Sequence, residues 1–430
     1  MRNSKEEIQF YIQRLYDKNL TTMSGGNLSI KEDNSTFVTP SEVDKGNLTP
    51  EDIMEVTNSG ETIGKHRVTS EFSVHKAIYE NNENMRAVLH SHTSSILGFS
   101  TAHILPKVDI LADVAKTLHN KIGMAKYADP GTKDLADVTI AVLDGKDNLV
   151  AIEENHGLFI GHKDMKTCYD ILEDIDLVCK IENNAKKLTS DVVEINENDI
   201  DGYANFEATI ENSDETCANN YEQERKLVHE LLQRLYKRGI STCKNACFSY
   251  RLDNGDILIN PENVDVYELK PEDLVVIRNK KYIGSRKPHR DFYLHLAVYE
   301  NDKNNNSIIT SRPPYVMAYG CSDKEYVTRV VAECYGYLRN IVKKDFCYGD
   351  KACEVVKNHF DNYHNTLILK NYLTMVVAEY PLKTYDRMEV AESTAQAIIE
   401  TYLTAKPILM DQRSVEVIQK NCKIYPEPVE

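Results

Sequence analysis

Apolar residues in the first half of the chain recur at two spacings, which predict alternating helices and strands. A helix that begins in a capping box at residues 4–7 is predicted by four apolar residues at helical spacing, namely Ile8, Tyr11, Ile12 and Leu15. Further helices are predicted at 70–79, with Ser70 as the N-cap, at 132–143 and onward from 164, and strands at 27–30, 36–39, 86–92 and 149–153. Strands mixed with helices imply a sheet covered by helices, so we predict an α/β fold.

The same pattern returns in the second half of the chain, in the same order and at a nearly constant shift. The matching segments are 12–16 with 232–236, 39–44 with 260–265, 48–53 with 269–274, 75–80 with 295–300 and 166–170 with 383–386. Five ordered matches indicate a tandem duplication. We therefore predict two domains, 1–190 and 221–430, joined by a polar, acidic linker at 191–220 that contains at most one short strand.

Composition and charge narrow the classes of partner. The net charge of −16 argues against nucleic acid, because a phosphate backbone needs a basic face. No apolar run approaches the roughly 20 residues of a membrane helix, and the N-terminus shows no signal-peptide core. The ten cysteines have no framework spacing and no CxxC pair, which is typical of reduced thiols. We expect a cytoplasmic protein with a small-molecule substrate and no membrane or nucleic-acid partner.

Three histidines are the candidate metal ligands. His90 and His92 follow an apolar strand, where side chains at i and i+2 point to the same side and can share one ion. His156 follows a second apolar strand and precedes a glycine. Three neutral imidazoles suit zinc and leave a fourth position for substrate. A histidine pair at this spacing is a weak signal by itself, so the inference needs further support.

That support comes from motifs whose joint order resembles one family. The motifs are Met23-Ser-Gly-Gly-Asn-Leu-Ser29, Thr39-Pro-Ser41, Thr69-Ser-Glu71, His90-Ser-His92, Pro130-Gly-Thr-Lys-Asp-Leu135 and Asn155-His-Gly-Leu158. Across about 190 residues the first half resembles the class II aldolase/adducin family, and within it the L-fuculose-phosphate aldolases most. The resemblance implies a three-layer α-β-α sandwich, present here in two tandem copies, and one Zn²⁺ per chain in the N-terminal domain.

The resemblance also implies an activity. Zinc on His90, His92 and His156 would serve an aldehyde-lyase that cleaves a ketose phosphate into dihydroxyacetone phosphate and an aldehyde. Glu71 matches the family's acid/base, and it can be the fourth metal ligand at rest and the proton carrier once substrate displaces it. Similar ribulose-phosphate epimerases carry Asp at this position, so Glu71 favours a lyase.

The resemblance assigns phosphate binding to small donors near these residues. They are Gly26, Asn27, Ser41, Thr69 and Ser70, which can also be ordinary turn and cap residues. Backbone N–H groups of the glycine-rich segment and a helix N-terminus both attract anions. One departure puts the phosphate in question, because Glu42 stands where the family usually has Gly. Tyr127 is a candidate for the tyrosine that assists protonation in the aldolases.

The second copy lacks the metal ligands. Thr310, Arg312 and Tyr372 stand at the positions of the three histidines, Asp291 stands at the position of Glu71, and residues 244–247 replace the glycine-rich motif. Threonine and arginine cannot replace two imidazoles around zinc, so we predict a metal-free copy. Family members are ring tetramers with active sites near subunit interfaces, so a chain with two copies is expected to form a homo-oligomer, reaching such a ring as a dimer.

Two other kinds of function stay open. A metal-dependent epimerase, dehydratase or decarboxylase of the same family would use the same ligands. A non-catalytic, adducin-like binding protein would need none of them. The sequence does not choose the sugar phosphate, because the pocket shape selects the aldehyde end.

Overall fold

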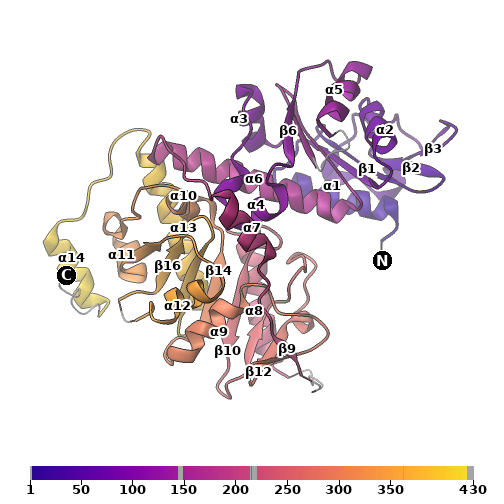
Figure 1. Ribbon diagram of the computed structural model, residues 1–430. Helices are drawn as coiled ribbons and strands as arrows, with labels where there is room; N and C mark the ends of the chain where they lie inside the picture. Colours follow the sequence, from indigo (N-terminus) through magenta and orange to yellow (C-terminus); the bar gives the residue numbers. More distant parts are fainter. Residues whose placement is uncertain (1, 144–148, 214, 216–219, 362, 424–430) are drawn as a thin grey trace. The chain divides into compact units, whose positions relative to one another are not determined.

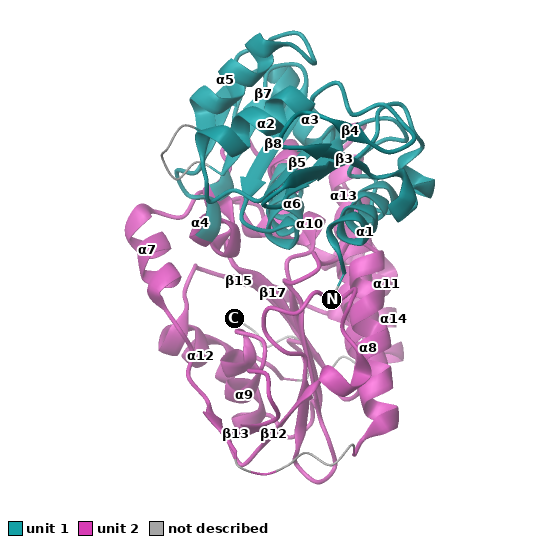
Figure 2. Ribbon diagram, turned by 90° about the vertical axis from the view of Figure 1, so that its right-hand side faces the viewer, with its two compact units in different colours: residues 1–108, 117–179 teal, residues 109–116, 180–430 magenta. Residues whose placement is uncertain are grey.

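The computed structural model describes residues 2–143, 149–213, 215, 220–361 and 363–423. The chain divides into two compact units (Figure 2): unit 1 comprises residues 1–108 and 117–179, and unit 2 comprises residues 109–116 and 180–430. The short segment 109–116 therefore belongs to unit 2, although the predicted domain boundaries place it in the first copy. Each unit contains one sheet, as the duplication predicts.

Unit 1 is built on an eight-stranded sheet in the order β4-β3-β2-β1-β5-β8-β7-β6 (Figure 1). Its strands are β1 (Asn27–Lys31), β2 (Ser35–Val38), β3 (Met54–Thr57), β4 (Thr62–Ile63), β5 (Ala87–Ser91), β6 (Ile122–Ala125), β7 (Val150–Glu153) and β8 (Gly157–His162). Its helices are α1 (Ser4–Asp17), α2 (Phe72–Asn81), α3 (Ser94–Ala102), α5 (Lys133–Leu143) and α6 (Met165–Leu188), the last of which continues into unit 2. All strand pairs are antiparallel except β6 with β7.

Helices cover both faces of this sheet, which explains why its central strands read as continuous apolar runs. On β5, Val88 packs with Val74 and Ile78 of α2 in a core that also includes residues of α5. Leu89, which points to the opposite face, is also fully buried. On that side α6 approaches β5, because Cys168 Sγ lies 3.7 Å from the carbonyl oxygen of Ala87. The three-layer α/β arrangement that we predicted is confirmed.

Unit 2 repeats this plan around a nine-stranded sheet in the order β15-β16-β17-β14-β10-β11-β12-β13-β9. Its strands are β9 (Glu211–Asn212), β10 (Cys247–Arg251), β11 (Ile257–Ile259), β12 (Val275–Arg278), β13 (Lys281–Ile283), β14 (Ser307–Ser311), β15 (Ile341–Lys344), β16 (Thr366–Leu369) and β17 (Leu373–Ala378). Its helices are α4 (Ala112–Leu118), which extends from unit 2 into unit 1, α7 (Glu197–Asn205), α8 (Glu222–Lys237), α9 (Phe292–Asn301), α10 (Pro314–Gly320), α11 (Ala332–Leu338), α12 (Gly349–Lys357), α13 (Pro381–Thr401) and α14 (Gln412–Asn421).

Three local predictions need correction. The capping box of α1 is formed by Asn3 and Glu6, one residue before the predicted pair, because the Asn3 side chain accepts from the Glu6 N–H at 3.0 Å. Ser70 does not cap α2; the N-cap residue is Glu71, and its side chain makes no capping bond. The predicted linker includes helix α7, in which Ile200 and Tyr203 are buried.

Two general features concern the whole described chain. Among the described residues, no helix has both the length and the apolar character that crossing a bilayer requires. The nine cysteines within the described residues are free thiols.

Candidate metal site

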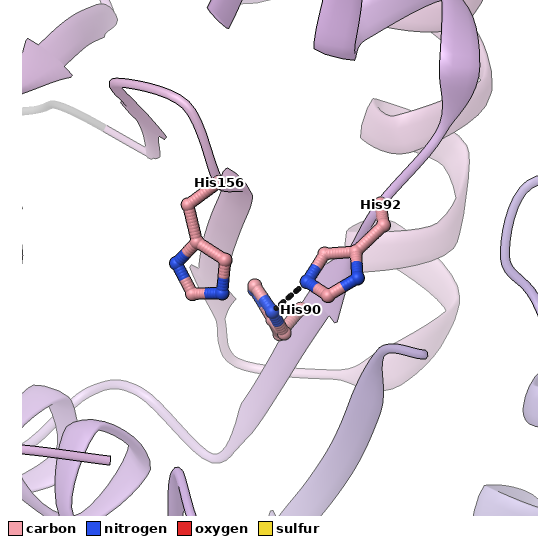
Figure 3. Close-up of side chains that lie close together, drawn as sticks. All are labelled: His90, His92 and His156. Atoms are coloured by element: carbon pink, nitrogen blue, oxygen red, sulfur yellow. Dashed lines mark hydrogen bonds between the residues drawn. The ribbon is translucent and has the colours of Figure 1, made fainter. Parts of the chain in front are cut away.

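Three imidazoles of unit 1 point toward one another (Figure 3). His90 lies on β5, His92 lies just after this strand, and His156 lies in the turn between β7 and β8. Their ligand nitrogens all lie within 4.8 Å of one another, and they form the only such group of metal-ligating side chains among the described residues. The antiparallel pairing of β5 with β8 brings the three imidazoles together. It places Ser91 opposite Leu158, so that His156, two residues before Leu158, lies beside His90 and His92.

The hydrogen bonds of His90 determine which nitrogen faces the centre of this group. Its Nδ1 lies 2.9 Å from the carbonyl oxygen of Leu158, and a carbonyl can only accept, so Nδ1 carries the proton. Burial holds the pKa of His90 well below its usual value, so the ring is neutral and its Nε2 presents a lone pair. Nε2 of His92 lies only 2.8 Å from that atom. This donor set fits a cation between the rings.

His156 is oriented from behind by a buried carboxylate. Its Nδ1 contacts Oε2 of Glu153, whose other oxygen accepts a hydrogen bond from Thr139 Oγ1 at 2.6 Å. Burial lowers the pKa of His156, but the hydrogen bonds and charges of Glu153 and Glu71 outweigh it and raise the pKa to about 9. A carboxylate behind a ligating imidazole is the usual outer-shell partner of a metal site. Glu153 and Thr139 were not predicted, although Glu153 lies at i−3 from His156.

Glu71 closes the fourth side of the group. Its oxygens lie 3.1 Å from His156 Nε2 and 3.3 Å from His90 Nε2, and its side chain is almost fully buried. Asn27 donates to the carboxylate at 2.7 Å. Burial raises the pKa of Glu71, but the electrostatic interaction with His90 and the hydrogen bonds from His156 and Asn27 together bring the pKa below its usual range. The carboxylate is therefore ionised and lies where a fourth ligand or a proton acceptor would be needed.

Two glycines allow the backbone to approach these side chains. A Cβ at Gly157 would lie 2.6 Å from the carbonyl oxygen of Ser91 and 2.9 Å from Cδ2 of His92. Gly26 has a φ of +66°, and a Cβ there would lie 2.8 Å from the carbonyl oxygen of His90. The requirement for glycine at 26 therefore has a packing reason. Its predicted part in phosphate binding stays a prediction.

The other residues predicted to bind phosphate lie on the loops before α2. Thr69 is buried, Ser70 is exposed, and Ser41 is joined to the same region because its N–H donates to the carbonyl of Arg67. The carboxylate of Glu42 pairs with Arg67 at 2.5 Å, and both side chains are 77% exposed. Glu42 thus has a cationic partner at the surface, which removes the electrostatic objection to a phosphate nearby.

The backbone at Glu42 has a conformation that glycine adopts at little cost. Its φ is +55°, in the left-handed region, where a side chain costs roughly 1 kcal/mol. Asn263 has the matching position in the second copy, and its φ is +58°. The turn is therefore retained in both copies, with a different residue in each.

His75 belongs to a hydrogen-bond network that both copies share. The ring is fully buried; its Nδ1 lies 2.7 Å from Ser29 Oγ, which also lies 2.7 Å from Tyr79 Oη. The second copy keeps the same arrangement, with corresponding distances of 2.7 Å and 2.8 Å. A network that persists without metal ligands belongs to the fold. In unit 1 its other end, Nε2 of His75, holds the side-chain oxygen of Asn27 and so orients the amide that donates to Glu71.

Tyr127 has a partner outside this group of histidines. Its hydroxyl donates to Asp129 at 2.9 Å, and the side chain is 52% exposed. That hydrogen bond is the first cause of an increase in the pKa of the phenol. The suggestion that Tyr127 assists protonation stays a prediction.

The corresponding place in unit 2 contains a buried ion pair. Arg312 donates to Asp291 at 2.7 Å, and both side chains are completely buried. Thr310 and Tyr372 also donate to Asp291, at 3.0 Å and 3.1 Å. Burial raises the pKa of Asp291, but the charge and hydrogen bond of Arg312 and the charges of His289 and Arg290 together bring the pKa below its usual range. A guanidinium thus supplies the positive charge that the carboxylate needs.

A segment from the first copy completes this cluster. Asp113 of α4, within the part of α4 that belongs to unit 2, lies 2.7 Å from Arg312 and accepts a hydrogen bond from Tyr203 of α7. The cluster therefore depends on contacts between residues as far apart in sequence as Asp113 and Tyr203, which are separated by 90 positions. It has no imidazole at the positions of the three ligands.

Comparison with known proteins gives the following findings. The family model described as "Class II Aldolase and Adducin N-terminal domain" matches residues 6–183 and again residues 226–399. An L-fuculose phosphate aldolase of Methanococcus maripaludis is 31% identical over 175 residues, which is 40% of this chain and 93% of that protein. A 5-deoxy-D-ribulose 1-phosphate aldolase of Bacillus thuringiensis is 29% identical, over 44% of this chain and 88% of that protein. A 3-oxo-tetronate 4-phosphate decarboxylase of Cupriavidus necator is 27% identical, over 31% and 62%.

Proposed function

Because this chain belongs to the class II aldolase and adducin family, we propose that its first copy is a metal-dependent carbon–carbon lyase. The substrate would be a ketose 1-phosphate, cleaved into dihydroxyacetone phosphate and an aldehyde. The observation that carries the proposal is the convergence of three imidazoles with a buried glutamate. The relatives named as aldolases of L-fuculose phosphate and 5-deoxy-D-ribulose 1-phosphate support it.

His90, His92 and His156 would hold the metal, with Glu71 as a fourth donor before substrate binds. Three imidazoles and a carboxylate suit Zn²⁺. When bound, the cation would supply a Lewis acid that stabilises negative charge developing beside the substrate carbonyl. Leu158 and Glu153 would hold two of the rings in the orientation that this requires.

Glu71 would move the proton. It is ionised and close to the histidines, and Asn27 holds one of its oxygens. As the carbon–carbon bond breaks, the carboxylate would accept the hydroxyl proton of the half that becomes the aldehyde. It would then return a proton to carbon of the dihydroxyacetone phosphate half. Its burial keeps water away from this exchange.

Phosphate would be held next to this group by Gly26, Asn27, Ser41, Thr69 and Ser70. Thr69 and Ser70 precede the N-terminus of α2, where the helix dipole and free N–H groups attract an anion. Asn27 already donates to Glu71, so its contribution to phosphate would come from its remaining backbone or amide N–H groups.

A decarboxylase is the second candidate, because one of the relatives carries that name. It would use the same metal ligands and release carbon dioxide from a 3-oxo acid phosphate. A homo-oligomer and a cytoplasmic location stay predictions; a measured solution mass tests the first.

The first test is metal content together with a substrate panel. Protein purified without chelator is expected to hold one zinc per chain, and a His92→Ala variant none. His66→Asn is the histidine control, because His66 contacts Asp52 and is not part of the histidine group. L-fuculose 1-phosphate and 5-deoxy-D-ribulose 1-phosphate are assayed for dihydroxyacetone phosphate, and a 3-oxo-tetronate 4-phosphate for carbon dioxide. Release of carbon dioxide without dihydroxyacetone phosphate would identify a decarboxylase in place of the proposed aldolase. Purified protein that contains no divalent ion would exclude both metal-dependent enzymes and favour a non-catalytic binding protein.

The second test addresses Glu71. Glu71→Gln keeps the shape of the side chain but cannot accept the proton, and loss of a general base typically costs 10²- to 10⁴-fold in rate. Glu80→Gln is the matched control, since Glu80 is an exposed glutamate on the same helix. Zinc content is measured in both variants. A Glu71→Gln enzyme that keeps both its zinc and its full rate would refute the proposed role.

A further inference from the structure

Two arginines of unit 2, Arg339 and Arg387, line two adjacent cavities. One cavity has a volume of about 540 Å³ and the other about 620 Å³, and both arginines border both of them. Arg387 is only 5% exposed, and its Nη1 donates to the carbonyl of Val377. Among the described residues, nothing bonds to the buried Nε atom of either arginine. Buried guanidinium donors without partners are costly and require an explanation.

The two arginines are also held together at a cost. Burial, opposed by the charge of Glu379 and reinforced by the positive charge of Arg339, lowers the pKa of Arg387 to about 10. Arg339 has a φ of +59° and a ψ of −119°, a conformation that favours glycine. Backbone strain of this kind costs of order 1–3 kcal/mol and is typical of binding sites.

The carboxylate of Glu389, which lines the first cavity, is engaged elsewhere, because it pairs with Arg238 at 2.9 Å. Glu379 lines the second cavity and pairs with Lys383 of the first at 2.9 Å. Asp386 is the other acidic residue that lines the first cavity, and burial raises its pKa, which disfavours its charged form. The cavity therefore carries an excess of positive charge within a chain whose net charge is −16.

We propose that this cavity binds the phosphate group of a small phosphorylated metabolite. Arg339 and Arg387 would supply the donors, since guanidinium groups match the geometry of phosphate oxygens and strengthen their hydrogen bonds by charge. Tyr337 and Tyr380, which line the same cavity, are 41% and 52% exposed and offer faces for the organic part. The site lies in the copy without metal ligands, so it is separate from the phosphate contacts proposed for unit 1 and does not rest on them.

Calorimetric titration of the full chain tests this site. The titrations use a Thr69→Val/Ser70→Ala background, so that binding in unit 1 does not contribute. Inorganic phosphate and AMP are the probes. We expect saturable binding in this background, at least tenfold weaker after Arg387→Met or Arg339→Gln and unchanged after Arg413→Gln, an exposed arginine of α14. Tighter binding of AMP than of phosphate would identify an ester, and equal binding would identify free phosphate; both support the site.

Thermal unfolding gives a second readout that a structural role would not produce. In phosphate-free buffer, Arg339→Gln is expected to raise the melting temperature, because it removes the repulsion between the two arginines. Phosphate is expected to raise the melting temperature of the Thr69→Val/Ser70→Ala chain and not that of the same chain with Arg339→Gln added. If Arg387→Met fails to fold, the Arg339→Gln variant still tests the site, because Arg339 is only half-buried. Unchanged affinity in both variants, or no saturable binding in the Thr69→Val/Ser70→Ala background, would overturn the proposal while leaving the lyase proposal intact.

Discussion

Replacing Arg312 by Met is the sharpest test of the conclusion that the second copy has a buried ion pair in place of a metal. Arg312 lies 2.7 Å from Asp291 and 2.7 Å from Asp113, and its side chain is completely buried. Methionine fills much of the same space but donates no hydrogen bond. Asp291, which is also completely buried, would lose its cationic partner, and Asp113 would keep Arg290 at 3.6 Å and the hydrogen bond from Tyr203.

The expected loss is large. Removing one partner from a buried pair typically destabilises a protein by about 3–5 kcal/mol, because the remaining charge stays in a medium of low polarity. A unit of this size changes its melting temperature by about 2–4 °C for each kcal/mol, so the shift should be roughly 6–20 °C. Removing both charges leaves no unpaired charge at position 291, so Arg312→Met/Asp291→Asn should be less destabilised than the sum of the two single variants.

Urea unfolding followed by circular dichroism measures these differences. Hydrogen exchange in peptides from β14 assigns the affected transition to unit 2, because β14 (Ser307–Ser311) precedes Arg312 directly. Zinc content and lyase rate per folded molecule should not change, since the three histidines lie in unit 1. Two results would refute the buried ion pair. One is a single variant whose free energy of unfolding lies within about 1 kcal/mol of that of the parent chain. The other is a double variant whose loss equals the sum of the two single losses.

Two further predictions concern a glycine and a buried glutamate. Gly157→Ala should abolish zinc binding, measured by elemental analysis, because its Cβ would clash with Ser91 and His92. Gly98→Ala is the control and should bind zinc normally, because a Cβ at Gly98 has no neighbour within 4 Å. Retained zinc in Gly157→Ala would contradict the packing argument. Burial raises the pKa of Glu392 from 4.5 to about 7. The folded state therefore keeps a proton that the unfolded state loses, and stability should fall by about 3 kcal/mol as pH rises from 4.5 to 7. Glu392→Gln should remove that loss and be the more stable form at pH 8 in chemical unfolding; a difference between the two chains that does not vary with pH would contradict the assignment.

Much of the fold could be predicted from local patterns. The helical spacing of residues 8–15 and the apolar run before His90 identify α1 and β5 within a few residues, because burial of one helix face or of both strand faces leaves a periodic trace. Helix α7 was missed because it has only two buried apolar residues in a polar stretch. The caps of α1 and α2 were misplaced by one residue or more, since several adjacent polar residues could serve.

The candidate metal ligands were predictable for a different reason. Two histidines at i and i+2 of a strand share a side whatever the rest of the fold does. The residues that contact these histidines and Glu71 were harder to predict from the sequence. Glu153 and Asn27 act through contacts that depend on strand pairing, and the hydrogen bond from Asn27 to Glu71 joins residues 44 positions apart. Family motifs supplied Glu71, and no local pattern would have done so.

The sequence by itself determined the duplication, the alternation of elements and the single copy of the histidine ligands, because each of these is a property of residue identity and short-range spacing. Only the tertiary structure decided which groups surround those positions. Asp113, from the first copy, lies beside Arg312 of the second because segment 109–116 packs into unit 2. Two arginines, Arg339 and Arg387, share a cavity because a strained turn and a helix meet there. Such juxtapositions depend on long-range packing of apolar faces, which fixes distances between residues that no local spacing relates.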